Sequence, residues 1–185
     1  MKRITVSGIL SLVIFAFVAF TPNPGKMLST KTHIKFFSTT AAENIEANNY
    51  KSVSTFDTQT GEVVFSVPMQ SFEFEKALMQ KHFNSEDFLD TKANPKAKLV
   101  AKLSNLADFN PDKNGTYYTT FKGEMTINGK SNPINEKATI IVNGTKIKVL
   151  SKFNLKLADY GVAFEKGKPS TNIAKIVEVT VDAEY

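Results

Sequence analysis

The sequence predicts a mainly β protein with roughly eight antiparallel strands, folded over on themselves as a sandwich or a closed barrel. Apolar and polar residues alternate along most of the chain, as they do in strands that bury one face and expose the other. Asn-Gly pairs stand between the longest alternating segments, where two-residue hairpin turns need positive φ angles. The 185 residues suffice for one domain with a sizeable core. An eight-stranded barrel can be filled by side chains or can hold one small ligand, and periodicity does not separate these two outcomes.

The clearest strand covers residues 146–157. Four lysines share one parity of this segment, and apolar side chains such as Ile147 and Val149 dominate the other parity. One face of the strand is therefore expected to be exposed to solvent and the other to be buried. Asn128-Gly129 and Asn143-Gly144 predict hairpins before and after the preceding strand. The predicted strands are residues 33–38, 44–47, 62–67, 96–103, 116–127, 134–142, 147–157 and 177–185.

Residues 71–83 break the alternation and have helical spacing instead. We expect a helix over this segment, with Ser71 as its N-cap and Glu73 and Glu75 in its first turn. Ser85 can cap a second short turn. An insertion with this many large apolar side chains is either a plug at one end of a barrel or a lid over a lipid-sized pocket.

The N-terminus has the organisation of a secretory signal peptide. Two basic residues precede an apolar run from Ile9 to Phe20, which is too short for a comfortable membrane span of about 20 residues. Export to the periplasm or secretion is the expected destination. We predict that the chain has three segments: a signal peptide over 1–20, an extended leader over 21–29 and a β domain over 30–185.

Composition argues against most kinds of chemistry. The chain has no Cys, which excludes disulfides, thiolate zinc ligands and thiol catalysis, and its two His cannot form a three-histidine metal site. Neither His33 nor His82 stands beside a nucleophile motif. Removing residues 1–20 lowers the formal net charge from +5 to +3, and every remaining cation is Lys, which is typical of a solvated surface rather than of nucleic-acid binding. We therefore expect no catalytic residues, metal or cofactor.

An ordered set of motifs resembles the YceI-like lipid-binding family. The resemblance extends from about residue 30 to the C-terminus. The motifs that carry it are 33–40 (HIKFFSTT), 64–69 (VFSVPM) leading into 71–83, 88–90 (FLD), 94–97 (NPKA), 123–129 (GEMTING) with Pro133, and 156–161 (KLADYG).

This resemblance implies a lipocalin-like, eight-stranded antiparallel barrel with a short helical insertion, which binds a long apolar molecule inside. The implied partner is a long-chain lipid, either isoprenoid or a fatty acid derivative. Whether the protein forms a homodimer is left open. Dry walls of Phe, Leu, Met and Val can hold such a ligand without a conspicuous polar motif. The candidate lining residues are Phe36, Phe65, Val67, Phe72, Phe74, Leu78, Met79, His82, Phe83, Phe121, Met125, Phe153 and Leu155.

Three positions depart from the family pattern. Many relatives have an aromatic residue where this chain has Asn94, a Thr-Phe pair where it has Lys98-Leu99, and an Arg-rich hairpin where it has Asn128-Gly129-Lys130. These departures leave the identity of the ligand and its head-group contacts open.

Two other functions stay open at this point. The first is a structural or stress-related barrel without a ligand, which predicts a filled interior and an exposed apolar patch. The second is a hydrolase or isomerase acting on a bound lipid, which requires carboxylates or histidines that face the interior.

Overall fold

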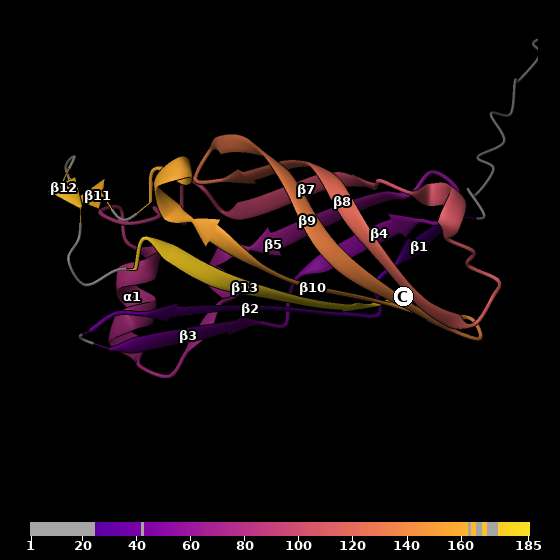
Figure 1. Ribbon diagram of the computed structural model, residues 1–185. Helices are drawn as coiled ribbons and strands as arrows, with labels where there is room; N and C mark the ends of the chain where they lie inside the picture. Colours follow the sequence, from indigo (N-terminus) through magenta and orange to yellow (C-terminus); the bar gives the residue numbers. More distant parts are fainter. Residues whose placement is uncertain (1–24, 42, 163, 166–167, 170–173) are drawn as a thin grey trace, which may run out of the picture.

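The computed structural model describes residues 25–41, 43–162, 164–165, 168–169 and 174–185. The predicted signal peptide lies outside these residues. Eleven of the described strands form one antiparallel sheet, in the order β1-β4-β5-β7-β8-β9-β10-β13-β2-β3-β6 (Figure 1). Its strands are β1 (Lys26–Leu28), β2 (Lys31–Thr39), β3 (Asn44–Asn49), β4 (Val53–Asp57), β5 (Glu62–Pro68), β6 (Glu73–Phe74), β7 (Lys96–Leu103), β8 (Gly115–Ile127), β9 (Lys130–Asn143), β10 (Lys146–Lys156) and β13 (Ile176–Glu184).

Short helical elements and one hairpin complete the described chain. The α-helix α1 (Ala77–Asn84) lies at one end of the sheet (Figure 1). Three 3-10 turns are η1 (Met69–Ser71), η2 (Leu106–Asp108) and η3 (Leu157–Tyr160). Strands β11 (Phe164–Glu165) and β12 (Lys168–Pro169) pair with each other in a separate two-stranded sheet.

The sheet closes on itself where β1 passes into β2. These strands are consecutive, yet β1 pairs with β4, whereas β2 pairs with β13 and β3. Between them, the Ser29 amide donates to the Ser54 carbonyl (2.8 Å) and the Thr30 amide donates to the Glu184 carbonyl (2.7 Å). Strands β3 and β4 also follow one another directly. With β1–β2 and β3–β4 each taken as one bent strand and the two-residue β6 set aside, the wall consists of eight strands, as many as the sequence predicts, and the mainly β barrel class is confirmed.

Buried hydroxyl groups join the bent strands near this closure. Thr32 Oγ1 lies 3.2 Å from Ser54 Oγ, which lies 2.7 Å from the Tyr185 hydroxyl. Burial raises the pKa of Tyr185 to about 12, and the hydrogen bond with Ser54 opposes this shift. The chain of hydroxyls connects β2, β4 and the residue after β13. None of these three hydroxyl groups is therefore buried without a hydrogen-bond partner.

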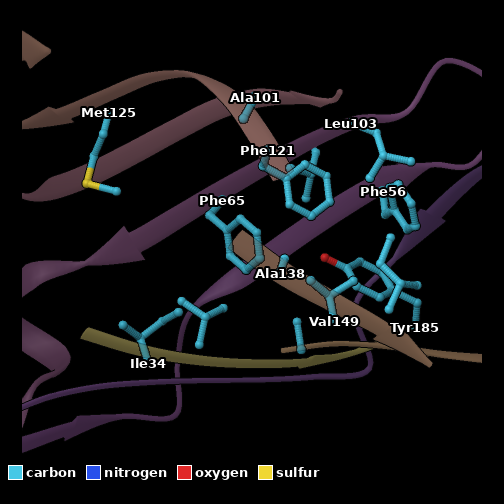
Figure 2. Close-up of a cluster of buried hydrophobic side chains, with 14 of the residues drawn as sticks. Ile34, Phe56, Phe65, Ala101, Leu103, Phe121, Met125, Ala138, Val149 and Tyr185 are labelled. Atoms are coloured by element: carbon cyan, nitrogen blue, oxygen red, sulfur yellow. The ribbon is translucent and has the colours of Figure 1, made fainter. Parts of the chain in front are cut away.

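The same end of the barrel is filled by apolar side chains. Phe56 is completely buried, and its ring centroid lies 5.6 Å from that of Phe109, 6.3 Å from that of Phe121 and 5.8 Å from that of Tyr185. Figure 2 shows Phe56, Phe121 and Tyr185 near one another, with the aliphatic side chains of Leu103 and Val149 beside them. Ring contacts of this geometry add to the stabilisation from burial. This packed end is the main core.

The helical insertion differs from the prediction at its N-terminal half. Ser71 ends the turn η1 instead of capping a helix, residues 73 and 74 form β6, and α1 begins at Ala77 after Lys76. Tertiary packing explains the difference, because Phe74 pairs with Ala47 of β3 and Phe72 is buried in the core. An extended chain places these two rings against the sheet, which local helix propensity does not take into account.

Both predicted hairpins are present. Asn128 (φ 51°) and Gly129 (φ 69°) form the two-residue turn between β8 and β9, as the sequence predicts. The second turn is shifted by one residue, since Asn143 ends β9 and pairs with Lys146. Gly144 has a φ of 60° in this turn.

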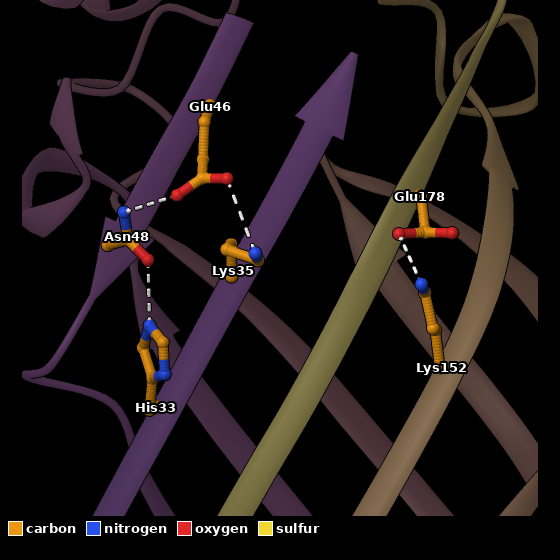
Figure 3. A network of polar contacts seen from close by, with 6 residues as sticks. All are labelled: His33, Lys35, Glu46, Asn48, Lys152 and Glu178. Atoms are coloured by element: carbon orange, nitrogen blue, oxygen red, sulfur yellow. Dashed lines mark hydrogen bonds and ion pairs between the residues drawn. The ribbon is translucent and has the colours of Figure 1, made fainter. Parts of the chain in front are cut away.

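The residues that face outward on the strands are mostly polar, and several of their side chains interact with one another (Figure 3). Glu46 accepts hydrogen bonds from Asn48 (3.3 Å) and Lys35 (3.3 Å), and these two contacts lower the pKa of its carboxyl group. The His33 ring lies 2.9 Å from the Asn48 side-chain oxygen. Because these groups are near solvent, we expect each ion pair to contribute little to stability.

The filled end of the barrel should dominate stability. We expect Phe56→Ala to lower the free energy of unfolding by about 3–5 kcal/mol, because it leaves a cavity that the surrounding rings cannot fill. Tyr118→Ala is a suitable control, because the side chain of Tyr118 is 78% exposed, and its effect should stay within about 0.5 kcal/mol. Chemical denaturation measures both values. Equal losses from the two substitutions would contradict a core centred on Phe56.

Candidate ligand-binding interior

The interior of the barrel is packed unevenly along its length. On β10, the inward-facing side chains of Ile147 and Val149 are buried, whereas those of Phe153 and Leu155 are half-buried. Toward the end that carries α1, β9 changes in the same way, whereas on β13 Val179 is half-buried and Val177 remains buried. The other half-buried, inward-facing apolar residues there are Phe36, Val67, Leu99, Ile127, Ile134 and Val179. Water reaches these side chains, so the interior at the α1 end is incompletely filled.

Aromatic rings of the insertion form one wall of this open half. The ring of Phe83, on α1, lies 5.0 Å from that of Phe74, 5.5 Å from that of Phe72 and 5.8 Å from that of Phe36 on β2. Phe88 follows at 6.2 Å from Phe83. The helix is thus held against the barrel through Phe83, which is the buried residue of α1. The insertion contributes apolar surface to the interior and is not a separate lobe.

The structure brings most of the predicted lining residues together. Those in the open half or in its aromatic wall are Phe36, Val67, Phe72, Phe74, Phe83, Phe153 and Leu155. Phe65, Phe121 and Met125 also face inward but are buried. Leu78 and His82 are exposed on α1, with 63% of Leu78 accessible, and Met79 is intermediate. We therefore leave Leu78 and His82 out of the proposed lining.

Asparagine side chains connect the loops around the open end. Asn94 Nδ2 donates to Asn128 Oδ1 (3.0 Å), and Asn128 Nδ2 donates to the carbonyl of Tyr160 (3.3 Å). Asn132 Nδ2 donates to the carbonyl of Asp159 (2.9 Å). The connection between α1 and β7, the β8–β9 hairpin and η3 are therefore joined into one rim. Asn94 and Asn128 are two of the positions at which the sequence departs from the family pattern.

Strands β9 and β10 separate at the open half. Their ladder ends at Ala138 paired with Ser151, and Ser151 Oγ donates to the Lys137 carbonyl (2.7 Å) at this point. Beyond it, β9 still pairs with β8, and β10 still pairs with β13. Turn η3 follows β10 and reaches back to β9 through the Asn132 contact. We call the opening between Ala138, Ser151 and η3 the fork.

Glu136 lies on β9 just beyond the apex of the fork. It has the inward parity of Ile134, Ala138 and Ile140, and it pairs directly with the buried Phe121 of β8. Desolvation raises the pKa of its carboxyl group. Sequence reasoning missed Glu136, although a carboxylate on the apolar parity of this strand was the signal that could have revealed it.

Tyr160 is buried on η3 on the far side of the fork. Burial raises the pKa of its phenol, and the negative charges of Asp159 and Glu136 raise it further. The Glu136 carboxylate is therefore close enough to Tyr160 for their charges to interact. The two residues place an acceptor and a phenol near the same opening.

Two hollows lie elsewhere on the surface. One, of about 870 Å³, crosses β8, β9, β10 and β13 and includes Tyr118, Lys137 and Lys152. The other, of about 570 Å³, lies near the closure between β1 and β2 and includes His33 and Tyr50. Neither is lined by any of the aromatic or aliphatic lining residues predicted from the sequence. The open half of the barrel remains the better candidate because its apolar side chains face one another.

Two further findings concern the described residues alone. They contain no group of three or more His, Asp or Glu side chains placed to hold a metal ion. No helix among them has the length and apolar content needed to cross a bilayer.

The fold and its interior define a class, namely antiparallel barrels that are packed at one end and apolar but unfilled at the other. The family model of the YceI-like domain matches residues 20–185. The chain therefore belongs to the YceI-like family. A UPF0312 protein of Shewanella denitrificans is 26% identical over 135 residues, which cover 68% of this chain and 67% of that protein.

Solved structures share the fold at low sequence identity. The polyisoprenoid-binding domain of Saccharophagus degradans aligns with a TM-score of 0.73 and 13% identity, covering 87% of this chain and 97% of that domain. Burkholderia cenocepacia BcnA aligns with a TM-score of 0.70 and 18% identity, covering 83% of this chain and 96% of BcnA. The YceI protein of Campylobacter jejuni aligns with a TM-score of 0.57 and 15% identity, covering all of this chain and 98% of that protein. At these identities the comparisons support the fold alone.

A buried hydroxyl near the open end offers a test of the packing. Ser38 Oγ on β2 is buried without a hydrogen-bond partner, which is costly for a polar atom. We expect Ser38→Ala to raise the free energy of unfolding of the ligand-free protein by about 1 kcal/mol, because the unpaired hydroxyl is removed. Ser54→Ala is the control with the opposite sign, since Ser54 is hydrogen-bonded to Thr32 and Tyr185. Denaturation curves that show a loss for Ser38→Ala would contradict the assignment.

Glu136 should make stability depend on pH in a defined direction. Because its pKa is raised in the folded state, the charged form destabilises the fold at pH values above that pKa, and protonation relieves the effect. Glu136→Gln should therefore stabilise the delipidated protein at pH 7, and the gain should fade as the pH approaches 4. Thermal unfolding from pH 4 to pH 8 measures this difference, with Glu124→Gln on the exposed parity of β8 as control. A gain that grows toward low pH would show that the pKa is lowered instead.

Proposed function

We propose that this protein is an exported carrier or storage protein that holds a long-chain apolar ligand, isoprenoid-like or derived from a fatty acid, in the open half of its barrel. One observation carries the proposal: many inward-facing apolar side chains are half-buried at the α1 end, while most of those at the other end are buried. A folded chain gains free energy when such surface is covered. A hydrocarbon chain of suitable length covers it without requiring a polar motif.

The magnitude is sufficient for useful affinity. Burying about ten methylene groups contributes roughly 8 kcal/mol, at about 0.8 kcal/mol each, before the costs of ordering the ligand are subtracted. The half-buried Phe36, Leu99, Phe153 and Leu155 come from three different strands, β2, β7 and β10, so they can contact a chain from more than one side. The polyisoprenoid-binding domain from Saccharophagus degradans supports an apolar ligand for this fold.

Export and the absence of catalysis are parts of the same proposal. The basic residues and apolar run of the first twenty residues support delivery to the periplasm or secretion. Glu136 is the acidic residue on the inward parity of the described wall strands, and one carboxylate without a second acid or an imidazole is no pair of the kind used in acid–base catalysis. Binding therefore accounts for the interior better than hydrolysis or isomerisation does.

Two adjacent residues of β7 provide a matched test of ligand loading. Leu99 faces the interior and Val100 faces out, with 37% of Val100 exposed. We expect the natively purified protein to release a long-chain lipid on solvent extraction, detected by mass spectrometry. Leu99→Asp should lower the amount of lipid per protein at least about tenfold, because a charge would face hydrocarbon, whereas Val100→Asp should leave it unchanged.

Circular dichroism and gel filtration establish that both variants are folded. If Leu99→Asp does not fold, Leu155→Trp, which occupies the same space without a charge, replaces it. Equal loading in wild type, Leu99→Asp and Leu155→Trp would place the ligand elsewhere. No extractable lipid in the wild type, together with no binding of added lipid, would favour the ligand-free structural role.

A further inference from the structure

Two charged side chains of the described wall strands have the inward parity, Glu136 and Lys130, and both lie on β9. Lys130 is the first residue of β9, six residues from Glu136, and its ammonium group lies beside Gly161. The lysines nearest to Glu136 and Phe121 in sequence, Lys137 and Lys122, have the outward parity. The inward neighbours of Glu136 are Ile134, Ala138 and Phe121. These apolar neighbours remove part of the hydration of the carboxylate, which costs free energy when the group is charged.

The fork gives this carboxylate a defined place along the barrel. Ala138 and Ser151 form the last pair between β9 and β10, so Glu136 and Phe153 are the first inward residues beyond it. Ala138 belongs to the packed end and Phe153 to the unfilled half. Glu136 therefore lies at the boundary where the filled core ends and the open interior begins.

No described residue satisfies the carboxylate. The hydrogen bonds and ion pairs of the described chain include none to Glu136, although the nearby acids Glu178 and Asp159 are each paired with a lysine, at 2.8 Å from Lys152 and 3.6 Å from Lys156. Lys152 and Lys156 have the outward parity of β10 and interact with these outer acids instead. The carboxylate of Glu136 thus keeps its acceptor capacity for a group that enters the interior.

We propose that Glu136 accepts a hydrogen bond from the polar end of the bound ligand, and that this end is a hydrogen-bond donor, an alcohol or an amine, instead of a phosphate or a carboxylate. The inference rests on the proposed function. The polar end then lies at the fork, between Glu136 and the turn that carries Tyr160. The hydrocarbon chain extends over Phe153 and Leu155 toward Phe36 and the aromatic wall.

Charge explains the selectivity for a donor. An anionic head group beside Glu136 would face its carboxylate, and the described lysine that shares the inward parity, Lys130, is six residues farther along β9, beside Gly161. An alcohol donates its hydrogen to the carboxylate, and an ammonium group adds charge attraction to the hydrogen bond. The side chain that is a cost in the empty barrel becomes a specific contact once such a ligand is bound.

Four compounds with the same eighteen-carbon chain test the inference: oleylamine, oleyl alcohol, methyl oleate and oleate. Delipidated wild-type protein should bind oleylamine and oleyl alcohol about tenfold more tightly than methyl oleate, which is what one charge-assisted hydrogen bond supplies. Oleate should bind more weakly than methyl oleate. Competition measured by native mass spectrometry at pH 8 gives the ratios directly.

Three variants separate the contact from a general effect. Glu136→Leu should bring the ratio of oleyl alcohol to methyl oleate close to one and relieve the discrimination against oleate. Glu136→Gln should keep the preference for the alcohol, because its amide oxygen still accepts, but lose the extra affinity for the amine. Glu124→Gln, on the exposed parity of β8, should behave as wild type.

A preference for oleate in the wild type, or ratios that survive Glu136→Leu, would overturn the inference while leaving the carrier function intact. If Glu136→Leu does not fold, the loss of amine preference in Glu136→Gln decides the question. Binding of none of the four compounds, with no lipid extracted from natively purified protein, would count against the proposed function itself. Equal binding of all four would show a purely hydrocarbon site and would also overturn the inference.

Discussion

The architecture depends on how one sheet buries its inner face. At one end, the bent strands β1–β2 and β3–β4 bring Thr32, Ser54 and Tyr185 together, and the aromatic rings around Phe56 leave no free space. At the other end, β9 and β10 separate after Ala138 and Ser151, and several inward-facing apolar side chains are only half-buried. Stability is concentrated in the first half, which leaves the second half free to remain unfilled. A ligand-binding barrel requires this division, because filling both ends would remove the site.

Most of the wall could be predicted from alternation alone. β7 has the predicted bounds, and the long strands differ from prediction by a few residues at their ends. β4 was not predicted, because the inward positions Ser52 and Ser54 are polar and resemble a loop. Their burial is possible because of tertiary hydrogen bonds, such as that from Ser52 Oγ to Asn49 Oδ1 (3.0 Å), which no local pattern reveals.

The candidate site was predictable in its apolar part and not in its polar part. Phe36, Phe74, Phe83 and Phe153 follow from the period of their segments, because large apolar side chains on one parity must face the interior. Leu78 was placed wrongly in a continuous helix face, since the helix starts only at Ala77 and is anchored through Phe83. The contact of Asn94 with Asn128 joins residues 34 positions apart, and it becomes visible only when the loops meet. Two departures from the family pattern are therefore one structural feature, a neutral hydrogen bond at the rim.

The asparagine contacts of the rim and the carboxylate of Glu136 in the interior together bear on which ligands such a barrel can select. Hydrocarbon contacts provide affinity but discriminate poorly between chains, since each methylene contributes about the same amount wherever it lies. Selection has to come from a polar group whose desolvation is compensated by one head group and not by another. Asn94, Asn128 and Asn132 are already hydrogen-bonded to other parts of the rim, so they hold the loops in place instead of offering free donors. Among the described acidic residues of the inner wall, Glu136 remains the group with an unused charge, and its position at the boundary of the packed core limits how deeply a polar end can enter.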